Sequence, residues 1–211
     1  MGNQPSFIAE ARREQIIEAA IKTLDEIGYV KASLAQIAKR AKISTGLISY
    51  HFADKRDLMN HLLMKLLERS TAYILERVQL KKTAQEKLVA FIEASLAYQY
   101  THPAHNSALI EIVFNARTPD NIPYYKLSDD EEEDQLTHEL QQILLEGQEK
   151  EEFEKFNVYV MASVIQGAIG EYMLSNSTIT QKIDLETYKS ELVKIVEKMI
   201  VFRNKEYVRT V

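Results

Sequence analysis

The sequence predicts an all-α protein with a short N-terminal helix-turn-helix part followed by a longer helical part. Turn-forming residues are scarce, because 211 residues contain only 6 Gly and 4 Pro, fewer than ordinary usage of about 7% and 5%. Apolar residues recur at three- and four-residue spacing along most of the chain, which is typical of amphipathic helices. Two short helical patterns adjoin at residues 42–44, and this close spacing predicts the tight turn between them.

The first 60 residues predict three helices and the start of a fourth. Residues 9–27 carry a helical apolar pattern that ends at Gly28, a common helix stop. Residues 33–36 read Ser-Leu-Ala-Gln, a capping box that predicts the start of a second helix. A third helix is expected from residue 44 or 45 to about 52, where it completes a helix-turn-helix motif.

The remainder of the chain is also expected to be helical. Helices are predicted over residues 54–80, 83–101, 105–117, 128–147 and 154–175, with a last helix along residues 185–200. Residues 118–125, which contain two prolines, are expected to form a loop. The longest uncharged apolar stretch, residues 156–170, has 15 residues, and a bilayer span needs about 20. No membrane span is therefore predicted.

Composition and charge narrow the function classes. The chain has no cysteine, which excludes disulfides, thiolate catalysis and cysteine-based metal sites and suits a cytoplasmic protein. The net charge is −5, but residues 1–60 carry +2 and the rest carries −7. Six basic side chains gather between residues 31 and 56 with a single acid, Asp54: Lys31, Lys39, Arg40, Lys42, Lys55 and Arg56. A compact basic patch on an acidic chain is typical of local phosphate contact.

The helix-turn-helix motif supplies the candidate DNA contacts. In such a motif the second helix lies in the major groove, and Ile43, Ile48 and Phe52 are expected to hold it against the first. Hydroxyls and free N–H groups at helix N-termini bind phosphates. The candidate DNA-binding residues are Ser33, Ser44, Thr45, Gly46, Leu47, Ser49, Tyr50, His51 and Lys55.

Three stretches of the N-terminal part closely resemble the TetR family over about residues 12–60. They are Ile16-Ile17-Glu18-Ala19-Ala20 through Gly28-Tyr29, Leu34-Ala35-Gln36-Ile37-Ala38-Lys39-Arg40-Ala41, and Ser44-Thr45-Gly46-Leu47-Ile48-Ser49-Tyr50-His51-Phe52-Ala53-Asp54-Lys55-Arg56-Asp57-Leu58. The commonest family pattern has tyrosine where Ser49 stands, and the string around Ser49 is similar to the BetI-type branch. The resemblance implies a homodimeric, ligand-responsive repressor of a palindromic DNA operator, with a DNA-binding domain at residues 1–54 and an effector-binding and dimerisation domain at residues 55–211.

The resemblance also implies an effector pocket and a dimer interface in the C-terminal part. The candidate pocket residues are Phe91, Tyr98, Phe114, Met161, Ile165 and Tyr172. This lining favours a largely apolar small molecule, with a cation held by aromatic rings near Glu111 and Glu171 as the alternative. Small residues between 162 and 170, such as Gly167, allow close helix approach, and with the last helix they are expected to pair with a second copy. An intramolecular core is the alternative.

Other function classes stay open at this point. No metal site, cofactor or catalytic group is expected, because His102 and His105 lack a nearby third ligand. A helical small-molecule-binding protein or enzyme with an incidental basic head is one alternative, and a DNA-binding protein without an effector is another. The choice between repressor and activator is open. In the preferred hypothesis the helix at residues 54–80 acts as a lever, and the effector selects a state in which the two recognition helices no longer match successive grooves.

Overall fold

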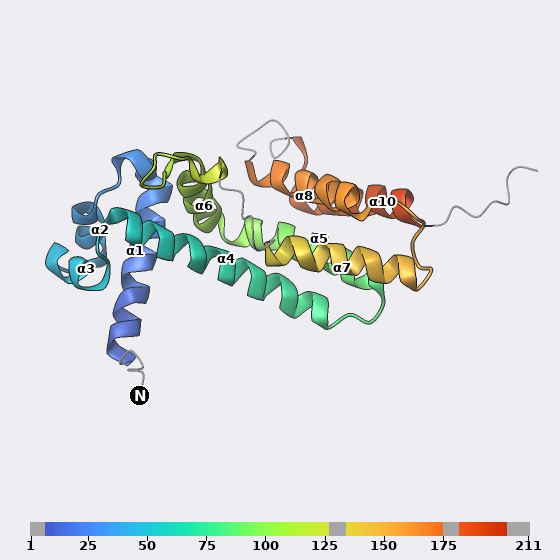
Figure 1. Ribbon diagram of the computed structural model, residues 1–211, viewed down its shortest axis with the longest axis horizontal. Coiled ribbons are helices and arrows are strands. Elements are labelled where there is room, and N and C mark those ends of the chain that lie inside the picture. The colour runs from blue at the N-terminus through green and yellow to red at the C-terminus, as the bar shows by residue number, and fades with distance from the viewer. Residues whose placement is uncertain (1–6, 127–133, 175–181, 202–211) are drawn as a thin grey trace, which may run out of the picture. The chain divides into compact units, whose positions relative to one another are not determined.

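The computed structural model describes residues 7–126, 134–174 and 182–201 (Figure 1). Within these residues the regular structure is helical, apart from an isolated bridge between Arg117 and Pro123. The helices are α1 (Phe7–Lys31), α2 (Leu34–Ala41), α3 (Thr45–His51), α4 (Lys55–Gln79), α5 (Ala84–Thr101), α6 (Pro103–Asn115), the 3-10 helix η1 (Tyr124–Lys126), α7 (Gln135–Glu149), α8 (Val158–Leu174) and α10 (Leu185–Ile200). The predicted all-α fold is confirmed. None of the described helices is long and apolar enough to cross a bilayer.

The chain divides into two compact units. Unit 1 comprises residues 1–69 and 102–128, and unit 2 comprises residues 70–101 and 129–211. The helix α4 contributes residues to both units, whereas α6 packs with the N-terminal helices of unit 1. These packing units do not follow the expected division at residue 54, which stays a prediction about function.

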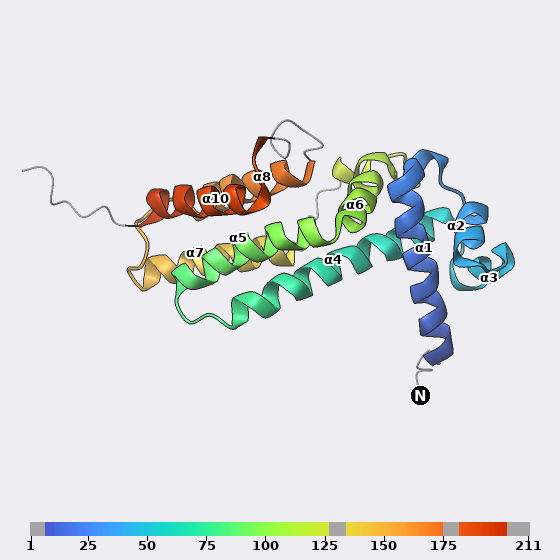
Figure 2. The ribbon, with the colours of Figure 1, turned by 180° about the vertical axis from the view of Figure 1, so that it is seen from behind.

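Unit 1 is built around α1, which packs against α2 and α6 (Figure 2). Its core consists of apolar side chains that α1, α2, α3, α4 and α6 bury together. The largest are Ile16, Ile21, Leu24, Ile37, Ile48, Phe52, Leu58, Met59 and Leu62. Ile48 and Phe52 are almost completely buried and Ile43 is partly buried against this cluster, so the expected support for the third helix is confirmed.

The local helix signals of unit 1 largely act as predicted. The Ser33 hydroxyl accepts from the Gln36 N–H at 3.3 Å, and the Ser44 hydroxyl accepts from the Leu47 N–H at 3.2 Å. Gly28 breaks α1 with φ 72° and ψ 168°, a conformation that glycine adopts easily. The helical turn then resumes as far as Lys31, three residues beyond the expected stop.

Unit 2 is centred on α5, which packs against α7, α8 and α10 (Figures 1 and 2). These helices and the end of α4 bury one apolar core, whose members include Phe91, Ile92, Leu96, Leu144, Phe153, Ile165 and Val196. The hydrophobic effect of this burial stabilises the unit at about 25 cal/mol per Å² of apolar surface.

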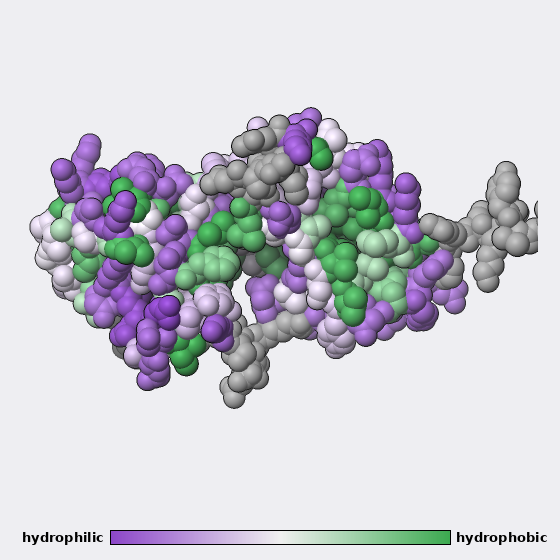
Figure 3. Space-filling model, turned by 90° about the horizontal axis from the view of Figure 1, so that it is seen from above, coloured by the Kyte–Doolittle hydropathy of each residue, from purple (hydrophilic) through white to green (hydrophobic). Residues whose placement is uncertain are grey.

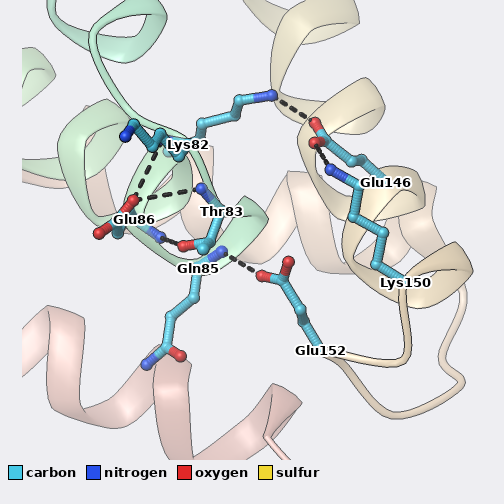
Figure 4. A network of polar contacts seen from close by, with 8 residues as sticks. Lys82, Thr83, Gln85, Glu86, Glu146, Lys150 and Glu152 are labelled. Atoms are coloured by element: carbon cyan, nitrogen blue, oxygen red, sulfur yellow. Dashed lines mark hydrogen bonds and ion pairs between the residues drawn. The ribbon is translucent and has the colours of Figure 1, made fainter.

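A polar network joins the start of α5 to the end of α7 at one margin of unit 2 (Figure 4). The carboxylate of Glu146 accepts from the ammonium groups of Lys150 and Lys87, each at 2.6 Å. These bonds, with Lys150 the stronger contributor, lower the pKa of Glu146. The backbone N–H of Gln85 donates to Glu152 at 3.0 Å. Such exposed pairs add little stability individually, and the bonds of Lys87 and Gln85 connect α5 to α7 and to the segment that follows it.

Three helices of the second half differ from the predicted bounds. Helix α6 begins at Pro103, two residues earlier than expected, because proline is well tolerated in the first helical turn. Helix α7 begins at Gln135, seven residues later than expected, because Asp134 accepts from the Thr137 N–H and caps the helix there, and it continues past Gly147 to Glu149. Residues 128–133, the expected start of this helix, lie outside the described residues. Helix α8 begins at Val158, four residues later than expected, because Asn157 accepts from the Val160 N–H and so caps the helix there.

Candidate nucleic-acid interface and effector region

The recognition helix α3 presents one exposed face and buries the other. Ile48 is fully buried, whereas the Tyr50 side chain is 80% exposed. The exposed candidate DNA-binding residues of the motif are Ser33, Ser44, Thr45, Gly46, Ser49 and Tyr50, and Leu47, His51 and Lys55 are half-buried. The structure therefore brings the polar candidates of α3 to a single exposed face.

The turn between α2 and α3 depends on a left-handed residue. Lys42 has φ 56° and ψ 42°, and its N–H donates to carbonyls of the last turn of α2. This geometry ends α2 and allows Ser44 to begin α3 two residues later. The side chain of Lys42 is exposed, as are those of Lys31 and Lys39.

Other members of the basic patch are engaged within unit 1. Arg40 pairs with both carboxylate oxygens of Glu26, and Arg56 lies 3.8 Å from a carboxylate oxygen of Asp54. Lys55 donates from Nζ to the Tyr29 carbonyl at 2.6 Å and lies over the Tyr29 ring. Burial lowers the pKa of Lys55.

Two α1 side chains that the sequence reasoning missed brace the motif from behind. Arg13 donates to the carbonyl of His51 at 3.0 Å, and Gln15 donates to the carbonyl of Ala41 at 2.7 Å. These carbonyls belong to the last turns of α3 and α2, where backbone acceptors lack intrahelical partners. The partners lie 38 and 26 residues away along the chain, so no local sequence signal identifies them.

His51 stands at the end of the recognition helix within this cationic surrounding. Burial and the nearby Arg13 and Arg12 lower its pKa, so its neutral form is favoured. Its ring makes an edge contact with the ring of Tyr50 at a centroid distance of 5.1 Å. The pair places an aromatic surface at the C-terminal end of α3.

The effector candidates fall into two separate groups. Phe91 and Ile165 lie in the core of unit 2, and Met161 and Tyr172 pack against that core. Tyr98 is a buried residue of the same unit. Phe114 belongs to unit 1, where its ring is 52% exposed and stacks on Tyr125.

Tyrosines frame part of the unit 2 group. The rings of Tyr73 and Tyr98 have centroids 5.3 Å apart, and those of Tyr172 and Tyr188 are 5.0 Å apart. The Tyr188 hydroxyl donates to the carbonyl of Ala168 at 2.6 Å. Burial raises the pKa of both Tyr172 and Tyr188, so both stay neutral at ordinary pH.

The two acidic candidates for a cation site belong to different units. The carboxylate of Glu111 accepts from the Tyr29 N–H at 2.7 Å in unit 1, and Glu171 is an exposed residue of α8 in unit 2. The rings of His102 and His105 have centroids 5.0 Å apart. Over residues 7–126, 134–174 and 182–201, no three metal-binding side chains gather into a cluster.

Comparison with known proteins shows which family the N-terminal motif resembles. The sequence profile described as "Bacterial regulatory proteins, tetR family" matches residues 16–62, which contain α2, α3 and the start of α4. Residues 16–62 are a TetR-family domain. The expected resemblance of the N-terminal part to the TetR family is confirmed for these residues, and the helix-turn-helix motif lies within them.

Relatives of this TetR-family domain include regulators of the expected branch. The HTH-type transcriptional regulator BetI of Burkholderia cenocepacia strain HI2424 is 38% identical over 90 residues, which cover 41% of this chain and 45% of that protein. The BetI of Paraburkholderia phytofirmans is 36% identical over 96 residues, 44% of this chain and 48% of that protein. The chain thus spans about half the length of these relatives.

Solved structures extend the likeness from the TetR-family domain to the whole fold. The fatty acid degradation regulator FadR of Bacillus halodurans aligns with a TM-score of 0.74 at 19% identity and covers 100% of both chains. FadR of Bacillus subtilis, in complex with stearoyl-CoA, aligns with a TM-score of 0.70 at 23% identity and covers 87% of this chain and 96% of that one. At these identities the likeness establishes the fold.

Proposed function

We propose that this chain is a ligand-responsive transcriptional repressor that binds a palindromic operator as a homodimer and is released by a small molecule. On this proposal residues 1–54 bind DNA, and residues 55–211 bind the effector and dimerise. The protein acts in the cytoplasm, where it meets DNA, and has no catalytic role.

The exposed face of α3 carries the proposal. Thr45, Gly46, Ser49 and Tyr50 share this face, and hydroxyls at such positions read base edges and phosphates in the major groove. A Cβ added to Gly46 would meet only the Ser44 hydroxyl, at 3.9 Å. Glycine is a poor helix former, and nothing in the surrounding chain requires it there. We propose that glycine is present at position 46 because it lets a DNA strand approach the backbone of α3 closely.

Exposed apolar residues on α8 and α10 support dimerisation through these helices. Val160 and Val164 of α8 are 61% and 48% exposed, and Ile195 and Met199 of α10 are 52% and 41% exposed. A Cβ added to Gly167 would meet nothing within 4 Å. Figure 3 shows hydrophobic side chains gathered on the face of α8 and α10. An exposed apolar face marks an interaction surface, and a palindromic operator, whose half-sites lie about 34–36 Å apart, needs a twofold dimer.

The core of unit 2 supports a largely apolar effector. Phe91 and Ile165 lie in this core, Met161 and Tyr172 pack against it, and Tyr98 is a buried residue of the same unit. The structure of Bacillus subtilis FadR contains stearoyl-CoA. We therefore propose fatty acyl thioesters as the first effector class to test, with aromatic-held cations as the second.

Effector release requires that the ligand prefer one conformation of the dimer. Helix α4 contributes to both units, and we propose that it changes the separation of the two α3 helices. Spin labels on exposed α3 positions of the dimer measure this separation. The effector is expected to shift the distance distribution, and release without any shift would instead indicate changed dynamics.

The deciding experiment is a DNA titration of the full chain. Palindromic fragments from the DNA upstream of its own gene are mixed with the protein at several salt concentrations, and binding is followed by fluorescence anisotropy. We expect salt-sensitive binding to one fragment in excess over scrambled DNA, followed by release on addition of the effector. Absence of salt-sensitive binding to all fragments contradicts the proposal, and binding without release by any ligand supports the effector-free alternative.

A further inference from the structure

A chain of contacts in unit 1 links α6 to the start of α4 through the end of α1. We infer that Glu111 of α6 is a positioning residue that holds Tyr29 in place, and that Tyr29 in turn holds the Lys55 ammonium ready for a DNA phosphate. The inference rests on the proposed DNA-binding function and adds a residue that lies outside the helix-turn-helix motif.

The first contact joins α6 to α1. Gly28 interrupts α1 with φ 72° and ψ 168°, so the next N–H leaves the intrahelical hydrogen-bond ladder. That N–H, of Tyr29, donates to Oε2 of Glu111 at 2.7 Å. Asn115 also donates to Oε2 of Glu111, at 3.2 Å. A hydrogen bond to an ionised acceptor is stronger than a neutral one, and here it fixes the peptide at the break in α1.

The second contact joins α1 to α4. The ammonium of Lys55 donates to the Tyr29 carbonyl at 2.6 Å and lies 4.2 Å from the centroid of the Tyr29 ring. The ring itself packs against the core of unit 1. An ammonium group has three N–H donors, so the bond to Tyr29 leaves donors for a phosphate. A side chain that is already ordered loses less entropy on binding.

The direction in which DNA affinity changes when Glu111 is replaced distinguishes a positioning role from a general electrostatic effect. Glu111 carries a negative charge within the unit that is proposed to bind DNA, and removing such a charge strengthens DNA binding through the overall field. If Glu111 positions Lys55, its removal weakens binding instead. The two accounts therefore predict opposite changes for the same substitution.

The experiment compares Glu111→Ala with Lys55→Met and with the double variant in the full chain, using the operator fragment that the wild type selects. We expect Glu111→Ala to weaken binding about fivefold and to lower the salt slope by about as much as Lys55→Met. In the Lys55→Met background, Glu111→Ala is expected to have no further effect, because the residue through which it acts is gone.

Two matched variants control the result. Asp25→Ala removes an exposed carboxylate from α1 and is expected to leave binding unchanged or slightly tighter. Glu111→Gln keeps an oxygen acceptor for the Tyr29 N–H, and its affinity is expected to stay within about twofold of the wild type. Glu111→Ala binding as tightly as Asp25→Ala, additivity with Lys55→Met, or a Glu111→Gln variant as weak as Glu111→Ala would each overturn the inference.

A measurement without DNA separates the inference from the proposed function. Nuclear magnetic resonance relaxation of the Lys55 side chain reports its order in the free protein, and circular dichroism verifies that each variant is folded. Glu111→Ala is expected to make the Lys55 side chain more mobile, and unchanged mobility in a folded variant contradicts the positioning role. If the wild type binds no DNA, the proposed function fails, whatever the mobility result.

Discussion

The guanidinium of Arg13 donates to the carbonyl oxygen of His51 at 3.0 Å and lies 5.1 Å from the centroid of the Phe52 ring. One residue of α1 thus closes the C-terminal end of the recognition helix and covers the aromatic residue that anchors it. Arg13 therefore supports α3 in addition to the contacts within the motif itself, and on the proposed DNA-binding function α1 helps to position the recognition helix.

Arg13→Ala is expected to weaken operator binding about tenfold, because a hydrogen bond from a charged donor contributes about 1.5–3 kcal/mol and its loss frees the end of α3. Binding to scrambled DNA should fall less. Anisotropy titrations on both DNAs test this. Arg12→Ala removes the same charge from the neighbouring position, and an equal loss in both variants would show that charge alone is responsible.

Tyr50→Ala is expected to reduce operator affinity about tenfold, with little change on random DNA, because a good base contact discriminates by about 1–3 kcal/mol. The side chain is 80% exposed, so the melting temperature should not change. Lys55→Met, by contrast, should weaken binding to every sequence and flatten the salt dependence. Equal losses for Tyr50→Ala on both DNAs would remove Tyr50 from sequence reading.

Gly147→Ala is expected to destabilise unit 2 by about 1–3 kcal/mol. A Cβ at this position would lie 2.0 Å from the ring of Phe153, and that ring is buried at 1% exposure, so the loop after α7 has to move. Chemical denaturation measures the free energy of unfolding. Gly46→Ala, where a Cβ would meet only the Ser44 hydroxyl at 3.9 Å, is the control for this stability measurement because it lies outside the face proposed for dimerisation, and an equal loss there would refute the steric explanation.

Val164→Glu and Ile195→Glu are expected to convert the proposed dimer to a monomer, because each places a charge on the exposed face of α8 and α10 and leaves the core of unit 2 unchanged. Light scattering after size-exclusion chromatography gives the mass. Met64→Glu changes a residue of α4 that is 65% exposed and should leave the mass unchanged. A dimer that survives both substitutions would place the interface elsewhere.

Stability is expected to fall as the pH drops from about 7.5 to about 5.5. Burial is the leading cause that lowers the pKa of His51 and of His105, and nearby arginines add to it. A histidine whose folded pKa lies below its unfolded pKa stabilises the fold above the unfolded value, near 6.5, and this stability is lost as the pH falls through it.

His105→Gln should therefore flatten the fall of the melting temperature between these pH values, because glutamine stays neutral throughout. Thermal unfolding followed by circular dichroism across the pH range tests it. A slope identical to that of the wild type would assign the pH dependence to other groups.

The sequence by itself determined that the chain is helical and where α2 and α3 begin, whereas several other helix ends differ from the expected bounds. Capping by Ser33 and Ser44 acts across three residues, and the burial of Ile48 opposite Tyr50 follows from helical periodicity. The recognition helix and its family could therefore be predicted, because every signal lies within one short stretch of chain. The choice of Leu192 and Val196 for the core and of Ile195 for the exposed face of α10 was not predictable, since all three lie on one broad apolar stripe.

Tertiary structure alone decided which distant groups meet. It placed Phe114 in a different unit from the other effector candidates, and it joined Arg13 to His51, Gln15 to Ala41 and Glu111 to Tyr29. The last pair is separated by 82 residues. Periodicity and capping operate over one or two helical turns, whereas these contacts depend on how whole helices pack, and a carboxylate such as Glu111 carries no local sign of the backbone amide it will bind.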